Sequence, residues 1–338
     1  MKYVCSLNQE FNEEFVAEMS KLFNLDSHLI RLLCSRGIDT QEKINNFLNP
    51  SITHLHDPYL FENMKAAVEL IEKHIENNSK FLIFGDYDVD GISASAILIK
   101  YFESVGVNVS SFMPNRYEDG YGLNINTLDK IFEKDIPNII ITVDCGITSV
   151  EEVEYIKSKG IDIVVTDHHE RAEQLPNCLI INPKVSETYP FKSLCGAGVA
   201  LKLVQALAGI TKASEYFPIC AIATIADIVE LFDENRAIVA LGLKNIDKAP
   251  AGVLKLMHEC GISKNAKASD IAFKLAPKIN ASGRMGSAET SLELYLETNP
   301  NQIKKLCSQI IEFNNQRQQL CDKVYKKKKT FLSTKDIF

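Results

Sequence analysis

From residue 80 onward, short β-branched segments alternate with segments of helical periodicity, and this alternation limits the possible fold more than any other feature. The strand-like segments are almost continuous in apolar character: "KFLIFG", "VNVSSFM", "NIIITVD", "IDIVVTD" and "CLIIN". The segments between them, such as "TSVEEVEYIKSKG", have helical spacing. Strands that alternate with helices form βαβ units, and strands that are apolar on both faces belong to a covered parallel sheet. We therefore predict an α/β fold with a parallel β-sheet flanked by helices.

Helical segments precede and follow the predicted sheet. Residues 1–78 predict an N-terminal helical region that caps the α/β domain of residues 79–235. Residues 236–300 continue that domain in helical form. Residues 301–338 begin one long polar helix, which would connect to further domains that this chain lacks.

Composition limits the cellular setting and the partners. The 338 residues are 46% hydrophobic, which is enough for more than one domain, and no run of about 18 apolar residues predicts a membrane span. Nine scattered cysteines without a C-x-x-C pair indicate reduced thiols, and the N-terminus has no secretory pattern, so we expect a cytoplasmic protein without a membrane partner. The net charge of −7 argues against nucleic acid as a partner, unless bound cations cancel part of it.

Acidic and histidine residues follow three of the predicted strands directly. Because ligands bind outside the carboxyl ends of parallel strands, these side chains are expected to meet at one edge of the sheet. A further carboxylate lies within the apolar, helix-like run "FPICAIATIADIVEL", where a charge is costly without a partner. The set consists of Asp86, Asp88 and Asp90 after the first strand, Asp144 after the third, Asp167, His168 and His169 after the fourth, and Asp227 in the apolar run.

The donor types in this set indicate a metal site. Carboxylates with imidazoles and no thiolate suit Mn²⁺ or Mg²⁺, and several shared carboxylates suit two cations that activate water in phosphoryl chemistry. Each residue alone has a plainer interpretation. Asp86 could be a turn former or a helix N-cap, and Asp-His-His could form a surface turn. Asp227 could be an ordinary helix residue whose carboxylate is hydrogen-bonded. Their joint occurrence at successive strand ends favours the metal site.

Several motifs extend this prediction. The stretches "DYDVDG", "VDCGI", "TDHHE" and "ADIVEL" resemble, in order, the motifs of the DHH phosphoesterase superfamily. Within it, "NRYEDGYGL", "CGAGVALKL" and "PKINASGRMGSA" are similar to the family of bacterial single-strand-specific 5′-to-3′ exonucleases. The resemblance covers most of residues 55–300. It implies a Mn²⁺- or Mg²⁺-dependent nuclease of DNA repair and recombination, with single-stranded DNA as its partner and a single-strand-binding protein or a helicase as further partners.

The resemblance also implies roles for the individual residues. Asp86, Asp88, Asp90, Asp144, His168 and Asp227 would hold two cations, with Asp144 between them. His169 would contact the scissile phosphate, and Asp167 would orient a neighbouring imidazole. The nucleophile would be a metal-bound hydroxide.

Substrate contacts are expected from residues outside these motifs. Arg116 and Arg284 are candidate phosphate ligands, because a guanidinium matches a phosphate in a bidentate manner. Asn280 and Ser282 would add neutral donors beside Arg284. The plainer interpretation of Arg284 is an ion pair with Glu289. In addition, Tyr117 and Tyr121 could either stack on nucleobases or pack in the hydrophobic core, and the sequence does not decide between these two roles.

The chain also departs from the family pattern. After the helix that begins near residue 301, no glycine-rich motif of the second family domain and no barrel pattern of an OB-fold follows. We expect either a truncated chain or a reduced family member, with poor affinity and processivity. A phosphodiesterase for short oligonucleotides or cyclic dinucleotides and an inactive fragment or interaction module remain the alternatives.

Overall fold

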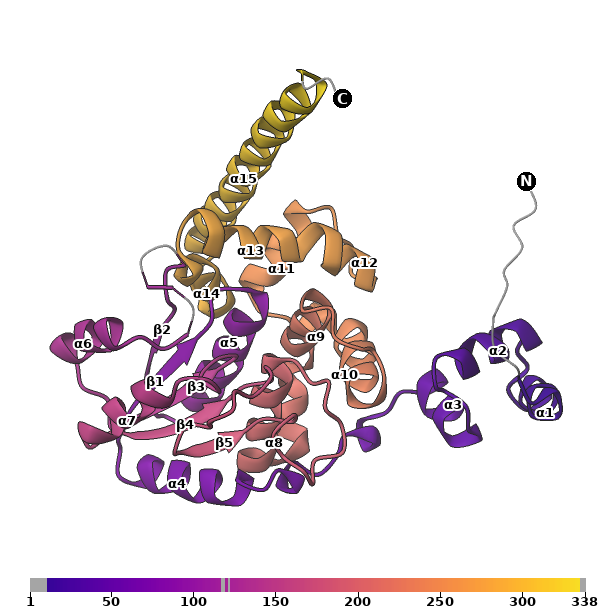
Figure 1. Ribbon diagram of the computed structural model, residues 1–338, viewed down its shortest axis with the longest axis horizontal. Helices are drawn as coiled ribbons and strands as arrows, with labels where there is room; N and C mark the ends of the chain where they lie inside the picture. The colour runs from indigo at the N-terminus through magenta and orange to yellow at the C-terminus, as the bar shows by residue number, and fades with distance from the viewer. Residues whose placement is uncertain (1–10, 117–118, 121, 335–338) are drawn as a thin grey trace. The chain divides into compact units, whose positions relative to one another are not determined.

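The structure is a computed structural model that describes residues 11–116, 119–120 and 122–334 (Figure 1). The chain divides into two compact units, Met1–Leu55 and His56–Phe338. The helix at residues 64–76, which the sequence groups with the N-terminal region, belongs to the second unit and packs against its sheet and helices. In the described residues, no helix is both long and apolar enough to cross a bilayer.

The first unit is a set of short helices with side-chain caps. Its helices are α1 (Glu13–Phe23), α2 (Ser27–Ser35), α3 (Gln41–Leu48) and η1 (Ile52–His54). Asn12, Asp26 and Thr40 each accept a hydrogen bond from a backbone N–H in the first turn that follows. These residue types are the preferred N-caps, which explains where α1, α2 and α3 begin.

The second unit contains the predicted parallel sheet. All five expected strands are present and every pairing is parallel, in the order β2-β1-β3-β4-β5. The strands are β1 (Lys80–Gly85), β2 (Asn108–Phe112), β3 (Ile139–Val143), β4 (Asp162–Thr166) and β5 (Leu179–Ile181). The α/β prediction is therefore confirmed.

Helices cover both faces of the sheet, as the nearly continuous apolar strands require. On one face lie α5 (Val89–Ser104) and α8 (Gly196–Ala213), and the Phe81 ring of β1 packs 4.9 Å from the Phe102 ring of α5. On the other face lie α6 (Ile125–Lys134) and α7 (Val150–Ser158), whose apolar side chains share one buried cluster with alternate strand residues. Figure 1 shows these layers, with α4 (Met64–Glu76) along the lower side.

The strand order reverses between β1 and β3, because the chain moves outward from β1 in one direction to β2 and in the other to β3, β4 and β5. At such a switch point, the loops that follow the two central strands diverge and leave a crevice for a ligand. Asp86 follows β1 and Asp144 follows β3. The topology therefore places both carboxylates at the position where α/β proteins bind ligands.

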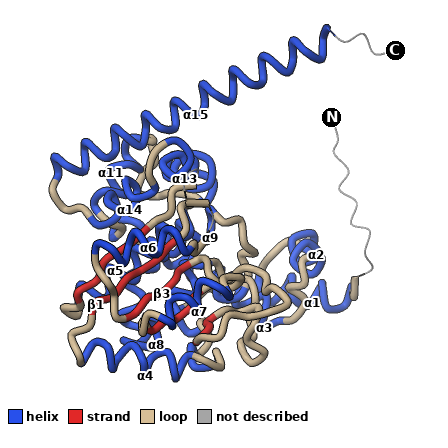
Figure 2. Tube along the Cα trace, turned by 60° about the vertical axis from the view of Figure 1, so that its left-hand side comes forward, coloured by secondary structure: helices blue, strands red, loops and turns tan. Residues whose placement is uncertain are grey.

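Most of the remaining helices belong to the segment after β5, and several of them pack beside α5 (Figures 1 and 2). They are η2 (Pro58–Leu60), η3 (Ser214–Tyr216), α9 (Phe217–Ala226), α10 (Asp233–Lys244), η4 (Ile246–Lys248), α11 (Ala251–Glu259), α12 (Ala268–Asp270), η5 (Ile271–Leu275), α13 (Ala276–Met285), α14 (Ala288–Leu296) and α15 (Pro300–Thr334). The first part of α15 contacts α11, α13 and α14. Helix α11 lies within residues 236–300, which the sequence predicts to be helical.

One helix ends earlier than its sequence suggests. The apolar run "FPICAIATIADIVEL" predicts helix through Asp227, but α9 ends at Ala226 and Asp227 is its C-cap. The next residue, Ile228, has a positive φ of 61° and is 89% exposed. This left-handed conformation stops the helix, so Asp227 lies at a helix end instead of within a helix.

Candidate metal centre

The segment after β1 places three aspartates at the start of α5. Asp86 is 4% exposed and directly follows the strand. Asp88 is the N-cap of α5, and its Oδ1 accepts hydrogen bonds from the backbone N–H groups of Asp90 (2.8 Å) and Gly91 (3.1 Å). The sequence offered Asp86 as a turn former or helix N-cap, but the N-cap of α5 is Asp88. The other Asp88 oxygen makes no contact in this cap.

Asp90 is held by the N-terminus of α8. The backbone N–H groups of Gly196 and Ala197 donate to its two carboxylate oxygens at 2.6 Å and 2.8 Å. The positive end of the helix dipole favours a carboxylate at this position. Each carboxylate oxygen retains a second lone pair, so the contact orients Asp90 and leaves it able to bind a cation.

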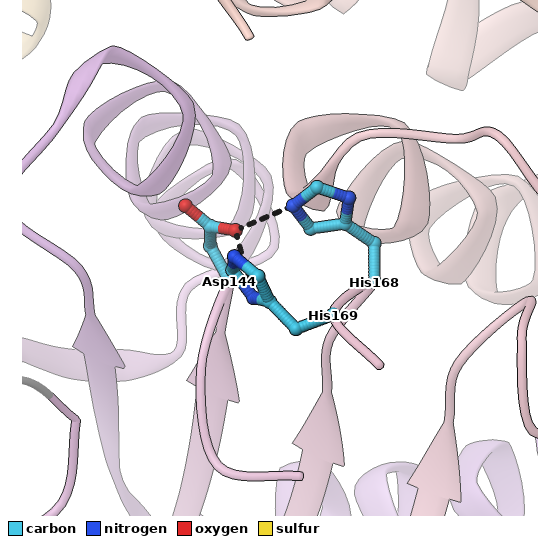
Figure 3. Close-up of side chains that lie close together, drawn as sticks. All are labelled: Asp144, His168 and His169. Atoms are coloured by element: carbon cyan, nitrogen blue, oxygen red, sulfur yellow. Dashed lines mark ion pairs between the residues drawn. The ribbon is translucent and has the colours of Figure 1, made fainter. Parts of the chain in front are cut away.

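The imidazole of His168 lies among three carboxylates from different elements. Its Nε2 is 3.1 Å from Asp144 Oδ1, 3.6 Å from Asp90 Oδ2 and 3.7 Å from Asp227 Oδ2. Figure 3 shows His168 and Asp144 pointing toward one another from the loops after β4 and β3. Asp144 has a positive φ of 60°, a strained conformation that turns its side chain into the site.

His169 faces the same centre but is held by a different partner. Its Nδ1 is 2.8 Å from Asp167 Oδ1. The same nitrogen is 3.9 Å from Asp144 Oδ1 (Figure 3). Asp167 also accepts hydrogen bonds from the backbone N–H groups of His168 (2.7 Å), His169 (3.1 Å) and Ile147 (2.9 Å). The Asp167 carboxylate is thereby fully engaged and orients the His169 ring.

Burial and mutual repulsion shift the pKa of several groups. Burial, with the Asp88 charge, raises the pKa of Asp86 to about 7, and burial, with the Asp90 charge, raises the pKa of Asp227 to about 7. The same causes raise the pKa of Asp88 and, most strongly, of Asp144. Burial lowers the pKa of His168, which favours the neutral ring, the form whose nitrogen can bind a metal.

The pKa values of the neighbouring pair, His169 and Asp167, shift in the opposite directions. The hydrogen bond to Asp167 raises the pKa of His169 despite partial burial. Burial opposes ionisation of Asp167, but the hydrogen bond and charge of His169 outweigh it, and the pKa of Asp167 is lowered. Both shifts favour the charged forms, a protonated His169 beside an ionised Asp167.

The donor atoms fall into overlapping groups that fit divalent cations. Within each group, one donor atom per residue lies within 4.8 Å of every other; the groups are Asp90–His168–Asp227, Asp86–Asp88–Asp144 and Asp144–His168–His169. Asp144 is also 3.1 Å from His168, so it lies between the first two groups. Hard carboxylate oxygens with one imidazole suit Mn²⁺ or Mg²⁺, and cations would relieve the repulsion that raises the carboxylate pKa values.

A pocket of about 250 Å³ opens beside the second group. It is lined by Asp86, Tyr87, Asp88, Arg116, His169, Asn280 and Arg284. Asn280 is fixed there, because its Oδ1 accepts a hydrogen bond from the Val89 backbone N–H at 3.1 Å. The pocket thus joins acidic residues at the end of β1 to guanidinium groups from two distant parts of the chain.

The structure does not bring Ser282 to this pocket, which corrects its expected role as a substrate contact. Its side chain is fully buried, donates to the Ile279 carbonyl oxygen at 2.7 Å and lies 2.8 Å from the Ser291 hydroxyl. Two residues turn an α-helix by about 200°, so Ser282 and Arg284 point in opposite directions. Tyr117 and Tyr121 lie outside the described residues.

Sequence reasoning missed the contacts that bring α8 and α13 to the site. A Cβ on Gly196 would lie 2.6 Å from the Asp144 Cβ, and a Cβ on Gly283 would lie 2.3 Å from the Tyr87 carbonyl oxygen. Both helices approach this closely only because these residues are glycines. The glycines in "CGAG" and "NASGRMG" were the available signals.

Comparison with known proteins places the chain in a family. Residues 80–229 match the model described as "DHH family, N-terminal domain". A crystal structure of exonuclease RecJ bound to manganese matches with 32% identity and a TM-score of 0.74, over 79% of this chain and 69% of that one. The chain belongs to the DHH family.

Several of the similar proteins are RecJ exonucleases. The single-stranded-DNA-specific exonuclease RecJ of Bacillus subtilis is 34% identical over 94% of this chain and 40% of its own length. RecJ of Thermus thermophilus, in a structure with Mn²⁺, matches with 28% identity and a TM-score of 0.81 over 93% of this chain and 46% of that one. The chain therefore spans less than half the length of these relatives.

Proposed function

We propose that this chain is a metal-dependent phosphodiesterase that hydrolyses single-stranded DNA from its 5′ end. One observation carries the proposal: two groups of carboxylate and imidazole donors meet at Asp144, beside a pocket lined by Arg116 and Arg284. The RecJ relatives, which are exonucleases specific for single-stranded DNA, support the substrate class.

The donor residues of the metal centre fall into one set for each cation. Asp90, His168 and Asp227 would hold one cation, Asp86 and Asp88 the other, and Asp144 both. Two divalent cations, Mn²⁺ or Mg²⁺, would activate water and neutralise charge on the phosphate when bound. The α8 amides hold Asp90 in position for this task, and the lowered pKa of His168 keeps its nitrogen unprotonated.

The arginine pocket would receive the 5′-terminal phosphate. Arg116 and Arg284 supply planar donors for phosphate oxygens, and Asn280 adds an amide. His169, held by Asp167 and favoured in its charged form, would donate a hydrogen bond to the phosphate that is cleaved. A terminal-phosphate pocket beside the metal centre limits cleavage to the end of a strand, which gives the proposed direction.

Further partners are part of the proposal. A single-strand-binding protein or a helicase would supply the single strand, and the chain would act in the cytoplasm. The small pocket also favours a second candidate, a phosphodiesterase for short oligonucleotides or cyclic dinucleotides. A cyclic dinucleotide has no 5′ end, so the two candidates differ in their dependence on a terminal phosphate.

The test is hydrolysis of a single-stranded DNA of roughly 20 nucleotides, longer than the usual site size of one binding module, with Mn²⁺, Mg²⁺ or EDTA. Strands with a 5′-phosphate or a 5′-hydroxyl, a duplex and a dinucleotide run in parallel, with Asp144→Asn as the blank. We expect metal-dependent release of mononucleotides from the 5′ end and none from the variant. Cleavage of the dinucleotide alone would favour the second candidate, and turnover by the variant would refute the role of Asp144.

A further inference from the structure

The helical stretch before Arg284 carries an exposed aromatic residue that the proposed function does not use. Residues 268–285 run without a break through α12, η5 and α13 (orange in Figure 1). Phe273, within the π-helical turn η5, is 81% exposed. A single exposed aromatic residue is common on protein surfaces, but this one lies on a π-helical turn, and such turns occur often at functional sites.

Phe273 lies on the same side of this stretch as Arg284. The two residues are eleven positions apart, which corresponds to about three helical turns. The opposite side is fixed by Ile271, Leu275 and Ile279, which are all fully buried. The side that presents Arg284 to the pocket therefore continues, about 16 Å further along the helix, to Phe273.

The turn that contains Phe273 is also adjacent to two elements that contribute residues to the candidate site. It packs against α9, the helix whose C-cap is Asp227 of the metal centre. It leads directly into α13, which carries Asn280 and Arg284 of the pocket. A ligand that extends out of the pocket along α13 would therefore reach Phe273.

The charge around Phe273 suits a polyanion. Between residues 261 and 285 the basic residues are Lys264, Lys267, Lys274, Lys278 and Arg284, and the sole acidic residue is Asp270. This stretch carries four net positive charges in a chain whose total is −7. Phosphates would be attracted here and repelled from most of the remaining surface.

From these observations we propose that Phe273 is a base-stacking site for a single strand whose 5′-phosphate occupies the arginine pocket. The inference rests on the proposed function and extends it beyond the terminal nucleotide. Aromatic rings stack on nucleobases with little sequence preference, while flanking lysines follow the backbone. The site would therefore bind single-stranded nucleic acid of any sequence and would not accept a duplex, whose bases are already stacked.

Tryptophan fluorescence can report stacking at this position directly, because the chain contains no tryptophan of its own. Phe273→Trp would introduce a single fluorophore that can still stack. The probe is a 5′-phosphorylated oligothymidylate of roughly eight nucleotides, long enough to leave the pocket, with Ca²⁺ in place of Mn²⁺. We expect its addition to quench the tryptophan fluorescence of the Phe273→Trp variant. Tyr59→Trp, at a half-exposed aromatic that contacts α8, is the matched control and should not respond.

Affinity gives the second readout. Phe273→Ala should weaken binding of the oligothymidylate about 5- to 100-fold, the range expected for loss of one stacked base. Binding of the 5′-phosphorylated dinucleotide should not change, and Phe273→Trp should restore affinity for the longer strand.

The outcomes separate this inference from the proposed function. If the unsubstituted chain binds and cleaves the strand while Phe273→Ala binds it equally well, the stacking site is refuted and the proposed function stands. If the unsubstituted chain neither binds nor cleaves any strand, both are refuted. Equal loss of dinucleotide and oligonucleotide binding in Phe273→Ala would mean that the substitution disturbs the pocket, and would also refute the stacking site.

Discussion

Gly196 lies directly against the side chain of Asp144: a Cβ at Gly196 would be 2.6 Å from the Asp144 Cβ and 2.8 Å from its Oδ1. The backbone N–H of the same glycine donates to Asp90 at 2.6 Å. A single residue without a side chain thus determines the positions of two carboxylates that belong to the two donor groups. The start of α8 is therefore a structural part of the metal centre.

We predict that Gly196→Ala reduces metal binding. The added methyl group must displace Asp144 or α8, and overpacking of this kind costs about 1–3 kcal/mol. Isothermal titration with Mn²⁺ should show at least one site with about tenfold lower affinity, a change of ~1.4 kcal/mol. Gly198→Ala is the matched control in the same helix, because its Cβ would meet the flexible Leu194 side chain at 3.2 Å. Equal Mn²⁺ affinity in both variants would contradict the prediction.

Arg284→Ala should remove the preference for a 5′-phosphorylated end. A hydrogen bond to a charged group contributes about 1.5–3 kcal/mol, so KM for a phosphorylated strand should rise roughly 10- to 100-fold. The 5′-hydroxyl strand is the control, and its KM should not change. Arg284→Lys should recover only part of the loss, since an ammonium cannot form the planar bidentate contact. A parallel rise in KM for both strands would show that Arg284 does not contact the terminal phosphate.

The stability of the metal-free protein should fall as pH rises from about 4 to about 7. The pKa values of Asp86 and Asp227 are about 7 in the folded chain, and an unfolded aspartate has its usual value near 3.9. In this interval the folded state holds protons that the unfolded state has released, so stability is highest at the acidic end and is lost as pH rises. Urea unfolding in EDTA at several pH values measures the effect, which should be on the order of a few kcal/mol.

The protons that Asp86 and Asp227 hold in the folded chain compete with metal ions for the carboxylate oxygens. Mn²⁺ affinity should therefore increase as pH rises through about 7, and each binding event should release protons. Asp86→Asn is the comparison, because it removes one of the titrating groups and should reduce the number of protons released. A pH-independent stability in EDTA would contradict the raised pKa values.

Lys202→Met should destabilise the second unit without altering its metal ligands. Lys202 and Glu234 are both fully buried, and their Nζ–Oε2 distance is 2.5 Å. Tyr189 donates to the other Glu234 oxygen. Removing the lysine leaves a buried, uncompensated carboxylate, which costs about 3–5 kcal/mol.

Urea unfolding provides the measurement for this pair. Lys212→Met, which removes the exposed ion pair with Glu215 from the end of the same helix, is the control and should cost less than about 1 kcal/mol. Equal midpoints for the two lysine variants would show that the buried pair does not stabilise the fold.

The sequence alone determined the parallel sheet, the segments that form its strands and the ligand-rich edge. The strands were predictable because a run such as Ile139–Val143 is apolar on both faces, a local property. The convergence of Asp86, Asp144 and His168 was predictable because parallel strands present their carboxyl ends on one edge. The DHH family was likewise evident from motifs that are contiguous in the chain.

Only the tertiary structure decided how these residues are held and which neighbours reach them. Asp90 is oriented by amides 106 and 107 residues away, Ser282 is turned into the core while Arg284 faces the pocket, and Asp227 lies at a helix end. Each of these results depends on the packing of α8, α9 or α13 against distant segments. Sequence periodicity reports which face of a helix is buried, but not which residue of another element lies opposite that face.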